Sequence, residues 1–363
     1  MGKPHGIAIV GLGVISRAYL ETIAEHPAIR IVAVADLDAA RAEAVAAELG
    51  AQALSVADAI AHPEVESVLN LTIPAAHAEV ALAAIAAGKD VFGEKPLTAT
   101  LAEAVEVTSA AQAAGTRVGS APDTVLGTGT QTARAAVEAG VIGRPISATA
   151  SWFAPGHERW HPNPDFYYLE GGGPLLDMGP YYLSSLVHTL GPVTAVIGAA
   201  SRQRDARTIG SGPRAGEVIP VTVATHVTGV LEHVSGVLTT VTMSFDGVRT
   251  GANPIEIHGE TGSLVVPDPN QFAGEVRLFA LGAEDWETLP PTAGYEDGAR
   301  GVGLLDFANG HARASGDLAI HVLEVMTLML ESAADGRRKL VSSTPTVPPL
   351  VPLTPAATWR SAS

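Results

Sequence analysis

The stretch IAIVGLGVIS, residues 7–16, decides the fold of this 363-residue chain. Its first four residues, Ile7–Val10, form an apolar run typical of a buried strand, and a glycine-rich turn follows directly and opens a helix. Gly11 allows the tight turn, and Gly13 lets the backbone approach a pyrophosphate at the helix N-terminus, where free N–H groups favour negative charge. Ser16 replaces a third glycine with another small residue. The turn therefore predicts a dinucleotide site with contacts from Gly11, Gly13, Val14 and Ile15.

The alternation of strand and helix continues through the first 120 residues. Apolar runs recur at Ile31–Ala35, Val68–Leu71 and Asp90–Phe92, each followed by an Ala-rich segment with apolar residues at helical spacing. The expected helices are Ser16–Glu25, Asp38–Leu49, Ala75–Ala87 and Thr98–Ala114, the last closed by Gly115. Such alternation joins parallel strands by right-handed crossovers, which predicts a doubly wound parallel sheet, an α/β Rossmann domain over residues 1–122.

A carboxylate ends the second expected strand. Asp36 lies twenty residues after Ser16, where it would accept hydrogen bonds from an adenosine ribose. It would repel a 2′-phosphate, its neighbour is Leu37, and Arg41 lies a full helical turn further on. The sequence therefore favours NAD over NADP.

The second part of the chain has a different pattern. After a helix near Val125–Ala139, long alternating runs at 146–153, 193–202, 221–230, 232–244, 255–259 and 275–280 are typical of antiparallel strands. Further helices are expected near Pro174–Leu190, Gly303–Gly310 and Gly316–Ala334. Residues 123–340 are thus expected to form an α+β domain that binds substrate and oligomerises, with a large, mostly antiparallel open sheet. One sheet face would be covered by helices; the other, expected to carry Thr225, Val227, Val237, Thr239 and Val241, would join subunits in a homodimer or homotetramer.

The last segment, residues 341–363, holds five prolines and shows no periodicity. It is expected to be an extended arm, anchored by Trp359 on its own or a neighbouring subunit.

Composition excludes several classes of function. The chain carries 22 Lys+Arg against 38 Asp+Glu, a formal net charge of −16, so nucleic acid and anionic membranes are not expected partners. It contains no Cys, which removes disulfides and Cys-ligated metal sites. No apolar run is long enough to span a membrane, and the expected location is the cytoplasm. His157, Glu158 and His161 lack the helical spacing of a metal site, so no metal is predicted.

Four short motifs now show a family resemblance. They are the turn at residues 11–16, Thr72-Ile73-Pro74 with His77, Gly88-Lys89-Asp90-Val91 leading into Gly93-Glu94-Lys95-Pro96, and the stretch GGGPLLDMG at residues 171–179. In this order they resemble the glucose–fructose oxidoreductase, inositol dehydrogenase and rhizopine catabolism (Gfo/Idh/MocA) family over essentially the whole chain. The resemblance implies a Rossmann domain followed by an α+β domain, and NAD(P)-dependent redox chemistry at a secondary alcohol of a sugar or cyclitol. It also adds Thr72, His77, Glu94 and Lys95 to the expected cofactor contacts.

Hydride transfer from a carbinol carbon needs a cation that holds the oxygen and a group that moves the proton of that oxygen. It also needs a third group that orients the proton-transfer group. By the resemblance, Lys95, one of only four lysines, is the cation, and Asp177 is catalytic. Tyr181 stands where most family members carry His, and Ser184 stands where many carry Asp. Asp177 and Tyr181 are one helical turn apart, so both can point at one substrate oxygen. Ionising a free tyrosine at pH 7 costs about 4 kcal/mol, so Tyr181 suits giving a proton to a carbonyl better than taking one from an alcohol.

The substrate side is expected in an aromatic stretch. Eight of the seventeen aromatic residues lie between Trp152 and Tyr182. Flat rings with polar tips match sugar rings, so Trp160, His161 and Tyr168 are expected to face a carbohydrate-like substrate, while Phe153 and Phe166 pack inward. Asp123 and Arg313 are further candidates for substrate contacts.

Three functions stay open on the sequence alone. The first is an NAD-dependent dehydrogenase or reductase that acts on CH–OH groups. The second is an NAD-dependent glycosidase or lyase that oxidises its sugar transiently, and the third is a non-catalytic, NAD-binding regulatory protein. The Lys95, Asp177 and Tyr181 set argues against the third.

Overall fold

The computed structural model describes residues 3–361, which form two compact units. Unit 1 comprises the chain up to residue 131 together with residues 292–320 and the segment from 348 onward. Unit 2 comprises residues 132–291 and 321–347. Residues 292–320 and 348–361, which the sequence analysis assigned to the second domain and to a separate arm, therefore belong to unit 1.

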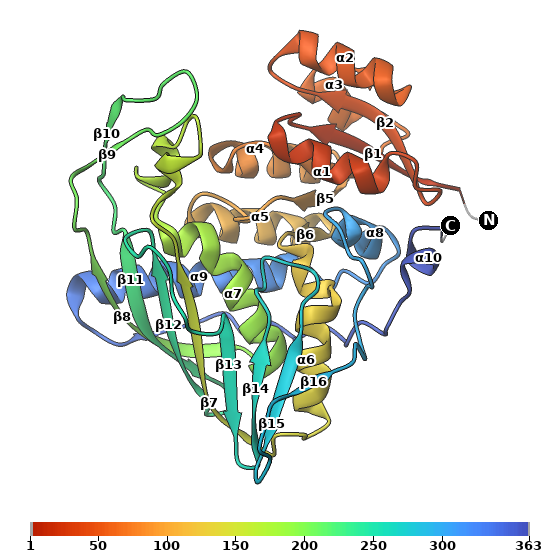
Figure 1. The fold of residues 1–363 in the computed structure, drawn as a ribbon. Coiled ribbons are helices and arrows are strands. Elements are labelled where there is room, and N and C mark those ends of the chain that lie inside the picture. The colour runs from red at the N-terminus through yellow and green to blue at the C-terminus, as the bar shows by residue number, and fades with distance from the viewer. Residues whose placement is uncertain (1–2, 362–363) are drawn as a thin grey trace. The chain divides into compact units, whose positions relative to one another are not determined.

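Unit 1 is built on a six-stranded parallel sheet of order β3-β2-β1-β4-β5-β6, as Figure 1 shows in red to yellow. The strand order reverses between β1 and β4, the position at which doubly wound sheets bind ligands beyond their carboxyl ends. The predicted Rossmann fold is confirmed, and the short strands β3 and β6 are additions to it. The strands are β1 (His5–Val10), β2 (Ile29–Ala35), β3 (Gln52–Ala53), β4 (Ser67–Asn70), β5 (Asp90–Gly93) and β6 (Val118–Ser120).

Three helices of unit 1 begin where a side chain caps them. Asp38 caps α2, Ser55 caps α3, and Thr100 with Glu103 forms a capping box on α5, so α5 begins three residues later than predicted. The left-handed Gly115 ends α5 as expected. The helices are α1 (Val14–Ile23), α2 (Ala39–Leu49), α3 (Val56–Ala61), α4 (Pro74–Ala86), α5 (Leu101–Ala114), η1 (Asp123–Leu126), α8 (Val302–Ala308) and α10 (Ala356–Trp359).

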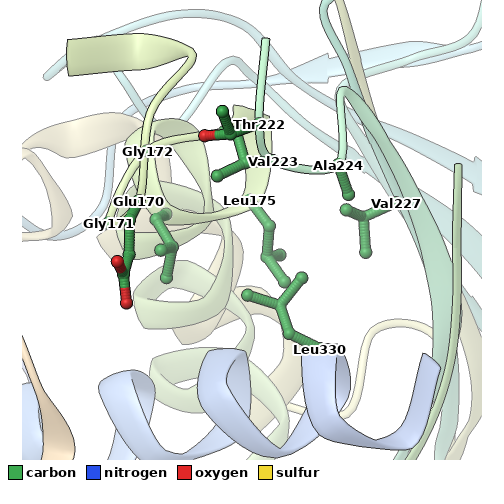
Figure 2. Close-up of a pocket in the computed structure, with 11 residues that line it drawn as sticks. Glu170, Gly171, Gly172, Leu175, Thr222, Val223, Ala224, Val227 and Leu330 are labelled. Atoms are coloured by element: carbon green, nitrogen blue, oxygen red, sulfur yellow. The ribbon is translucent and has the colours of Figure 1, made fainter. Parts of the chain in front are cut away.

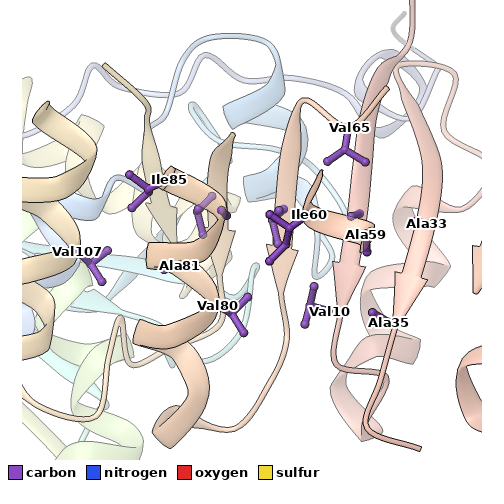
Figure 3. Packing of buried hydrophobic residues seen from close by; sticks show 14 of the residues in the cluster. Val10, Ala33, Ala35, Ala59, Ile60, Val65, Val80, Ala81, Ile85 and Val107 are labelled. Atoms are coloured by element: carbon purple, nitrogen blue, oxygen red, sulfur yellow. The ribbon is translucent and has the colours of Figure 1, made fainter. Parts of the chain in front are cut away.

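Small side chains fill the core on one face of this sheet. Figure 3 shows Val10, Ala33 and Ala35 of the strands against Ile60 of α3 and Val80 of α4. Several of these core residues are alanines, so helix and sheet backbones approach closely. The packing fixes the carboxyl ends of the strands, where the predicted cofactor residues lie.

The C-terminal segment is anchored on its own chain. The Trp359 side chain is buried, its Nε1 donates to the carbonyl of Glu296 at 2.8 Å, and its own carbonyl lies 2.7 Å from Nε2 of His26. Earlier in the segment, the N–H of Val351 donates to Oε1 of Gln131 at 3.0 Å. Of the two anchors the sequence left open for Trp359, the structure shows the one on its own chain.

Unit 2 is built on a nine-stranded sheet of order β16-β15-β14-β13-β7-β12-β11-β8-β17. Neighbouring strands are antiparallel except for β7 and β12, so the predicted mostly antiparallel sheet is confirmed. Its strands are β7 (Pro145–Phe153), β8 (Val193–Ser201), β11 (His226–His233), β12 (Leu238–Ser244), β13 (Ile255–Gly259), β14 (Gly262–Val266), β15 (Val276–Ala280), β16 (Glu287–Leu289) and β17 (Lys339–Leu340). A hairpin of β9 (Ala206–Thr208) and β10 (Val218–Pro220) stands apart from it.

The predicted run 232–244 is two strands. A tight turn at Gly236 (φ +83°) separates β11 from β12, because the N–H of Gly236 donates back to the carbonyl of His233.

Helices cover one face of the sheet. Helix α7 (Pro174–Leu190) contacts β7, β11 and β12 (Figure 1), and Met329 of α9 (Gly316–Asp335) lies against Gly198 and Gly229. Helix α6 (Thr128–Glu138) precedes the sheet, and the short helices η2 (His157–Arg159) and η3 (Asp165–Tyr167) follow β7.

The predicted composition of the uncovered face is wrong. The residues assigned to it are buried beneath the helices: Thr225, Val227, Val237, Thr239 and Val241. The sequence analysis placed them on the wrong side because the period-2 pattern of a strand does not reveal which face the helices cover. The opposite face carries Val230, which pairs with Ile197 on β8 and with Thr240 on β12.

Candidate active site

The glycine turn of unit 1 connects β1 to α1. Gly11 has a φ of +92°, and a Cβ built on it would lie 2.7 Å from the carbonyl carbon of Leu71, so only glycine fits. Gly13, the N-cap of α1, is different: a Cβ there would meet no heavy atom of the described residues within 4 Å. Packing within unit 1 explains the first glycine but not the second.

Three large apolar side chains are exposed just after β1, β2 and β4, one of them at the first residue of α1. Val14 is 96% exposed, Leu37 is fully exposed, and Ile73 is 69% exposed. Apolar side chains in contiguous loops at the carboxyl ends of parallel strands are typical of a ligand-binding edge. They lie where the sequence predicts the dinucleotide.

Asp36 is held by the turn itself. Its Oδ2 accepts the N–H of Leu12 at 2.7 Å, and its Oδ1 accepts the N–H of Asp38 at 2.9 Å. Burial alone would raise the pKa of Asp36, but these backbone hydrogen bonds and the charge of Arg41 outweigh it and hold the pKa below its ordinary value. Asp36 is therefore an ionised carboxylate at neutral pH, as a ribose ligand requires.

Arg41 lies closer to this carboxylate than its place in the sequence indicated. Its Nη1 is 3.4 Å from both oxygens of Asp36, and its Nη2 is 3.3 Å from Asp38. The first turn of α2 brings the guanidinium back over the end of β2. A cation thus stands beside the carboxylate that the sequence analysis used to separate NAD from NADP.

His77 connects two loops of unit 1. It is buried in α4, with Nδ1 2.7 Å from the carbonyl oxygen of Pro96 and Nε2 3.0 Å from that of Thr72. Thr72 is also tied to Asn70, whose Oδ1 accepts from the Thr72 hydroxyl at 2.7 Å. The structure therefore makes His77 a link between the Thr72 loop and the Glu94–Pro96 turn.

Glu94 fixes the turn that carries Lys95. Its Oε2 accepts the N–H of Lys95 at 3.0 Å, and its Oε1 accepts the hydroxyl of Tyr19 at 2.8 Å. Burial, together with the adjacent charge of Glu94, raises the pKa of Tyr19 well above its ordinary value, so its hydroxyl remains a donor. Tyr19 could not be predicted from local pattern, because its contact with Glu94 spans 75 residues of chain. Lys95 itself is half-buried at the end of β5.

Two predicted substrate residues are structural instead. Asp123 is fully buried, its Oδ2 accepts the N–H groups of Gly301 (2.8 Å) and Gly303 (3.2 Å), and burial raises its pKa despite nearby Arg300. The buried Arg313 pairs with Asp306, which also accepts the hydroxyl of Tyr295. The predictions for Asp123 and Arg313 were wrong: the partners of Asp123 lie 178 and 180 residues away in the chain, and Arg313 pairs with an aspartate seven residues before it that the local pattern did not single out.

In unit 2, helix α7 carries Asp177 and Tyr181 one turn apart. The helix begins after Gly173 (φ +99°) with Pro174 in its first turn, and Asp177 lies in that turn as well. Gly179 lets α7 pack closely on α9, since a Cβ there would lie 2.7 Å from Sδ of Met326. Tyr181 is buried. The predicted spacing of the pair on one helix is therefore present.

His157 contacts Asp177, a contact that the sequence analysis did not predict. The Nε2 of His157 lies 2.9 Å from Oδ2 of Asp177, and Nε1 of Trp160 donates to Nδ1 of His157 at 3.2 Å. Loop 154–173 brings the imidazole to α7. The only signal in the sequence was the position of His157 inside the aromatic stretch.

The aromatic stretch divides differently from the prediction. Trp160 is 58% exposed and His161 is half-buried, so both remain candidates for substrate contact. Burial lowers the pKa of His161, whose Nδ1 accepts the N–H of Asn163. Phe166 is 55% exposed, which overturns its predicted inward packing. Tyr168, predicted to face substrate, is fully buried in a cluster with Ile209, Ile219, Val221 and Phe245.

Tyr168 belongs to a buried ionic network. Its hydroxyl donates to Glu158, Glu158 pairs with Arg207 at 3.0 Å, and Arg207 pairs with Asp246 at 2.6 Å. Arg207 and Glu158 are both buried. Glu158 therefore stabilises the loop. Two of the three residues weighed above as a metal site have other partners in the structure: Glu158 binds Arg207, and His157 binds Asp177.

A cavity of about 380 Å³ lies beside the start of α7 in unit 2. Figure 2 shows Thr222, Val223 and Ala224 on one side, with Leu175 of α7 and Leu330 of α9 beneath them. Among the described residues that line it, Glu170 alone is charged, and neither Asp177 nor Tyr181 belongs to its wall. The cavity adjoins the helix that carries the catalytic candidates without being formed by them.

The predicted site residues thus form two groups. Unit 1 brings together the glycine turn, Asp36, the Thr72 loop and the Glu94–Lys95 turn, and unit 2 brings together Asp177, Tyr181, His157 and Trp160. Within residues 3–361, no helix is long and apolar enough to cross a membrane. The same range contains no group of three or more His, Asp or Glu side chains placed to hold a metal ion.

Comparison with known proteins agrees with this architecture. Residues 5–121 match the model of an oxidoreductase family with an NAD-binding Rossmann fold, and residues 130–265 match that of the GFO/IDH/MocA C-terminal domain. The chain is 27% identical over 337 residues to the 1,5-anhydro-D-fructose reductase of Ensifer adhaerens, a match that covers 91% of this chain and 96% of that one.

Solved structures share the fold over nearly the whole chain. An NAD-binding oxidoreductase from Klebsiella pneumoniae has a TM-score of 0.81 and 23% identity, covering 94% of this chain and 100% of that one. Levoglucosan dehydrogenase in complex with NADH and L-sorbose has a TM-score of 0.76 and 21% identity, covering 93% and 99%. With both domain models matched in the family's order, the chain belongs to the Gfo/Idh/MocA family of NAD-binding oxidoreductases.

Proposed function

We propose that this protein transfers a hydride between NAD and a secondary hydroxyl, or the corresponding ketone, of a sugar, cyclitol or glycoside. The observation that carries the proposal is Gly13. A side chain there would touch no described protein atom within 4 Å, yet the position is glycine at the N-terminus of a helix. A pyrophosphate bound against the backbone explains that choice, because it needs the space that a Cβ would take.

The residues of unit 1 fit the dinucleotide along its length. The N–H groups at the start of α1, around Val14 and Ile15, would hold the pyrophosphate, and the Asp36 carboxylate would accept the adenosine ribose hydroxyls. Leu37 and Ile73 would cover the apolar faces of the adenine. His77 contributes by holding the Thr72 loop against the Pro96 carbonyl. Bound NAD supplies the hydride acceptor, and NADH the hydride donor.

Preference for NAD over NADP belongs to the proposal. Asp36 is kept ionised by two backbone N–H groups and Arg41, so a 2′-phosphate would meet a negative charge. Arg41 moderates this repulsion because it is already paired with the carboxylate. We therefore expect NAD to bind more tightly, with weaker but measurable binding of NADP.

Lys95, Tyr181 and Asp177 would act on the substrate oxygen. The Lys95 ammonium holds and polarises that oxygen, and Glu94 fixes the Lys95 backbone. In the reducing direction the carbonyl carbon gains the hydride and the carbonyl oxygen gains the proton of the Tyr181 hydroxyl. Oxidation is the reverse. Asp177, one helical turn before Tyr181, orients the reacting groups.

A carbohydrate substrate is favoured by the aromatic loop and by the relatives. The indole of Trp160 and the imidazole of His161 offer a flat apolar surface with polar edges, which suits the C–H face and hydroxyl rim of a sugar ring. The similar proteins bear the names 1,5-anhydro-D-fructose reductase and levoglucosan dehydrogenase. Both names describe carbohydrate chemistry.

A homodimer or homotetramer formed through the uncovered sheet face completes the proposal. Ile197 and Leu238 are exposed there, and Val230 with Thr240 continues the same face. Exposed aliphatic side chains on an open sheet face are typical of a subunit interface. Glu232 and Glu256 lie on the same face by the strand register.

The test is a screen of sugars, cyclitols and glycosides with NAD and NADP, followed by thermal shift and by absorbance at 340 nm. NAD should raise the melting temperature more than NADP, and at least one compound should produce NADH. Aglycone release without net NADH would instead assign the protein to the NAD-dependent glycosidases. Stabilisation by neither nucleotide would refute the proposal.

A further inference from the structure

The imidazole of His157 is enclosed on several sides. Its ring centroid lies 4.5 Å from that of Tyr167, 4.7 Å from that of Phe245 and 5.1 Å from that of Trp160. The residue itself is buried. These rings restrict rotation of the imidazole, so the direction of its two nitrogens is set by packing.

The hydrogen bonds then determine which nitrogen carries the proton. An indole N–H can only donate, so Nδ1 of His157 must accept from Trp160 at 3.2 Å and holds no proton. The proton of the neutral ring is therefore on Nε2, which faces Oδ2 of Asp177 at 2.9 Å.

The backbone that carries His157 is fixed as well. Its N–H donates to the hydroxyl of Tyr168 at 3.0 Å, and that hydroxyl donates to Glu158. Gly156 has a φ of +107°, and a Cβ there would lie 2.7 Å from Nη1 of Arg207. The buried network of Tyr168, Glu158 and Arg207 thus anchors the loop beneath the imidazole.

We infer that His157 is the positioning residue of Asp177, and that Trp160 keeps its imidazole in the tautomer that donates from Nε2 to the carboxylate. The inference rests on the proposed role of Asp177. In this arrangement the Nε2–H of His157 contacts the carboxylate one helical turn before Tyr181, and this donor does not become an acceptor during the reaction. Misplacement of a reacting group by about 1 Å can cost about a hundredfold in rate, so loss of this contact should reduce kcat.

Two isosteric substitutions separate the two nitrogens. The side-chain N–H₂ of His157→Gln reaches the place of Nε2 and retains a donor to Asp177, whereas His157→Asn mimics only Nδ1 and loses it. We expect kcat to fall about tenfold to a hundredfold in the Asn variant and several-fold less in the Gln variant, with KM for NAD unchanged in both. If His157 only stabilised the fold, kcat would fall in both variants in proportion to the loss in their melting temperatures. His226→Gln, at a histidine on β11 whose ring lies beside Phe153, is the matched control and should keep wild-type kcat.

Trp160→Phe tests the tautomer directly. Nitrogen NMR of imidazole-labelled protein should show His157 protonated on Nε2 alone in the wild type. In the Phe variant, which keeps the aromatic packing but loses the donor to Nδ1, a mixture of protonation forms should appear with a several-fold lower kcat. A proton on Nδ1 in the wild type, or wild-type kcat in the Asn variant, would overturn the inference.

Failure of the proposed function would be distinguishable from failure of this inference. If no compound exchanges hydride with NAD, the proposed reaction is wrong. The NMR spectra of the wild type and of Asp177→Asn would still decide whether Nε2 of His157 donates to Asp177. An imidazole signal unaltered by Asp177→Asn would contradict that contact.

Discussion

At the scale of single residues, the chemistry depends on groups whose neighbours fix their charge or direction. Asp36 is held ionised by two backbone N–H groups, the Lys95 turn is held by Glu94, and Asp177 meets the N–H of His157. Asp36 could be proposed as a ribose ligand from its position at the end of a strand. The role of His157 could not be proposed from the sequence, because its contact with Asp177, twenty residues further along, depends on how the chain between them folds back onto α7.

Tyr181→Phe should lower kcat by about a hundredfold to a thousandfold while changing KM little, because it removes the proposed proton donor and keeps the ring. The measurement is steady-state reduction of the carbonyl substrate with NADH. Tyr182→Phe is the control, since the Tyr182 hydroxyl lies 3.5 Å from Asp268 and is not proposed to move a proton. Full activity in Tyr181→Phe would remove this residue from the mechanism.

Asp36→Ser should shift cofactor preference toward NADP. The substitution removes the negative charge that opposes a 2′-phosphate. Arg41, which lies 3.4 Å from the Asp36 carboxylate in the unmodified protein, is then available to attract the phosphate. Dissociation constants from calorimetry should show weaker NAD binding and NADP binding about tenfold tighter. An NADP preference in the unmodified protein would contradict the role assigned to Asp36.

At the scale of elements, the strand–turn–helix of residues 5–23 was predictable because every step of it is local. The strand is an apolar run, Gly11 makes the turn, and α1 follows within the same few residues. The failures arise where an element's surroundings come from distant sequence. Asp123 is held by Gly301 and Gly303, and Tyr168 packs on Ile219 and Phe245, so neither could be distinguished from a substrate ligand by local pattern.

Alanine at the two glycines of the turn should separate folding from cofactor binding. Gly11→Ala sets a Cβ 2.7 Å from Leu71 at a φ of +92°, so the free energy of unfolding should fall by about 2–3 kcal/mol. Gly13→Ala meets no described atom, so stability should be retained while the dissociation constant for NAD rises about tenfold or more. Urea unfolding and calorimetry measure the two quantities. Unchanged NAD affinity in Gly13→Ala would locate the pyrophosphate elsewhere.

His321, at the start of the unit 2 part of α9, makes stability depend on pH. Its Nε2 accepts the N–H of Val193 at 3.0 Å, and burial lowers its pKa from 6.5 to about 4. Below pH 6.5 the unfolded chain takes up a proton that the folded protein excludes, so stability is lost as pH falls from about 6.5 toward about 4.

Each unit of pH in that window should cost up to about 1.4 kcal/mol from this residue, and buried His188, whose pKa burial lowers to about 3, acts in the same direction. The loss of unfolding free energy between pH 7 and pH 5 should therefore be about 2 kcal/mol smaller in His321→Gln than in the wild type. Equal pH slopes in the variant and the wild type would show that His321 does not titrate in this way.

For the molecule as a whole, the order of helices and strands was more predictable than which sheet face is buried and which is exposed. The change from alternating strands and helices to long strands marked the two kinds of sheet, which the structure confirms. The composition of the uncovered face was not predictable, because the alternating pattern that contains Val227 and Val241 does not show which side of the strand is buried. Only the positions of α7 and α9 show that these two residues lie on the covered face.

The interface assigned to that face can be tested by charge. Ile197→Glu, alone or with Leu238→Glu, should reduce the assembly to a smaller species in light scattering after gel filtration, since both side chains are exposed on the proposed interface. Val105→Glu on α5, also exposed, is the control and should leave the mass unchanged. An unaltered mass in the double variant would show that subunits do not meet through this face.

In the proposed reaction a hydride moves between the substrate carbon and nicotinamide while Lys95 holds the oxygen. The most direct measurement is a single turnover with NAD and a carbohydrate substrate deuterated at the carbinol carbon, followed by mass analysis of the reduced cofactor. We expect one deuterium in the cofactor, slower reduction than with the protiated substrate, and a loss of about a thousandfold or more in Lys95→Met. Reduced cofactor without deuterium, or wild-type turnover in Lys95→Met, would contradict it.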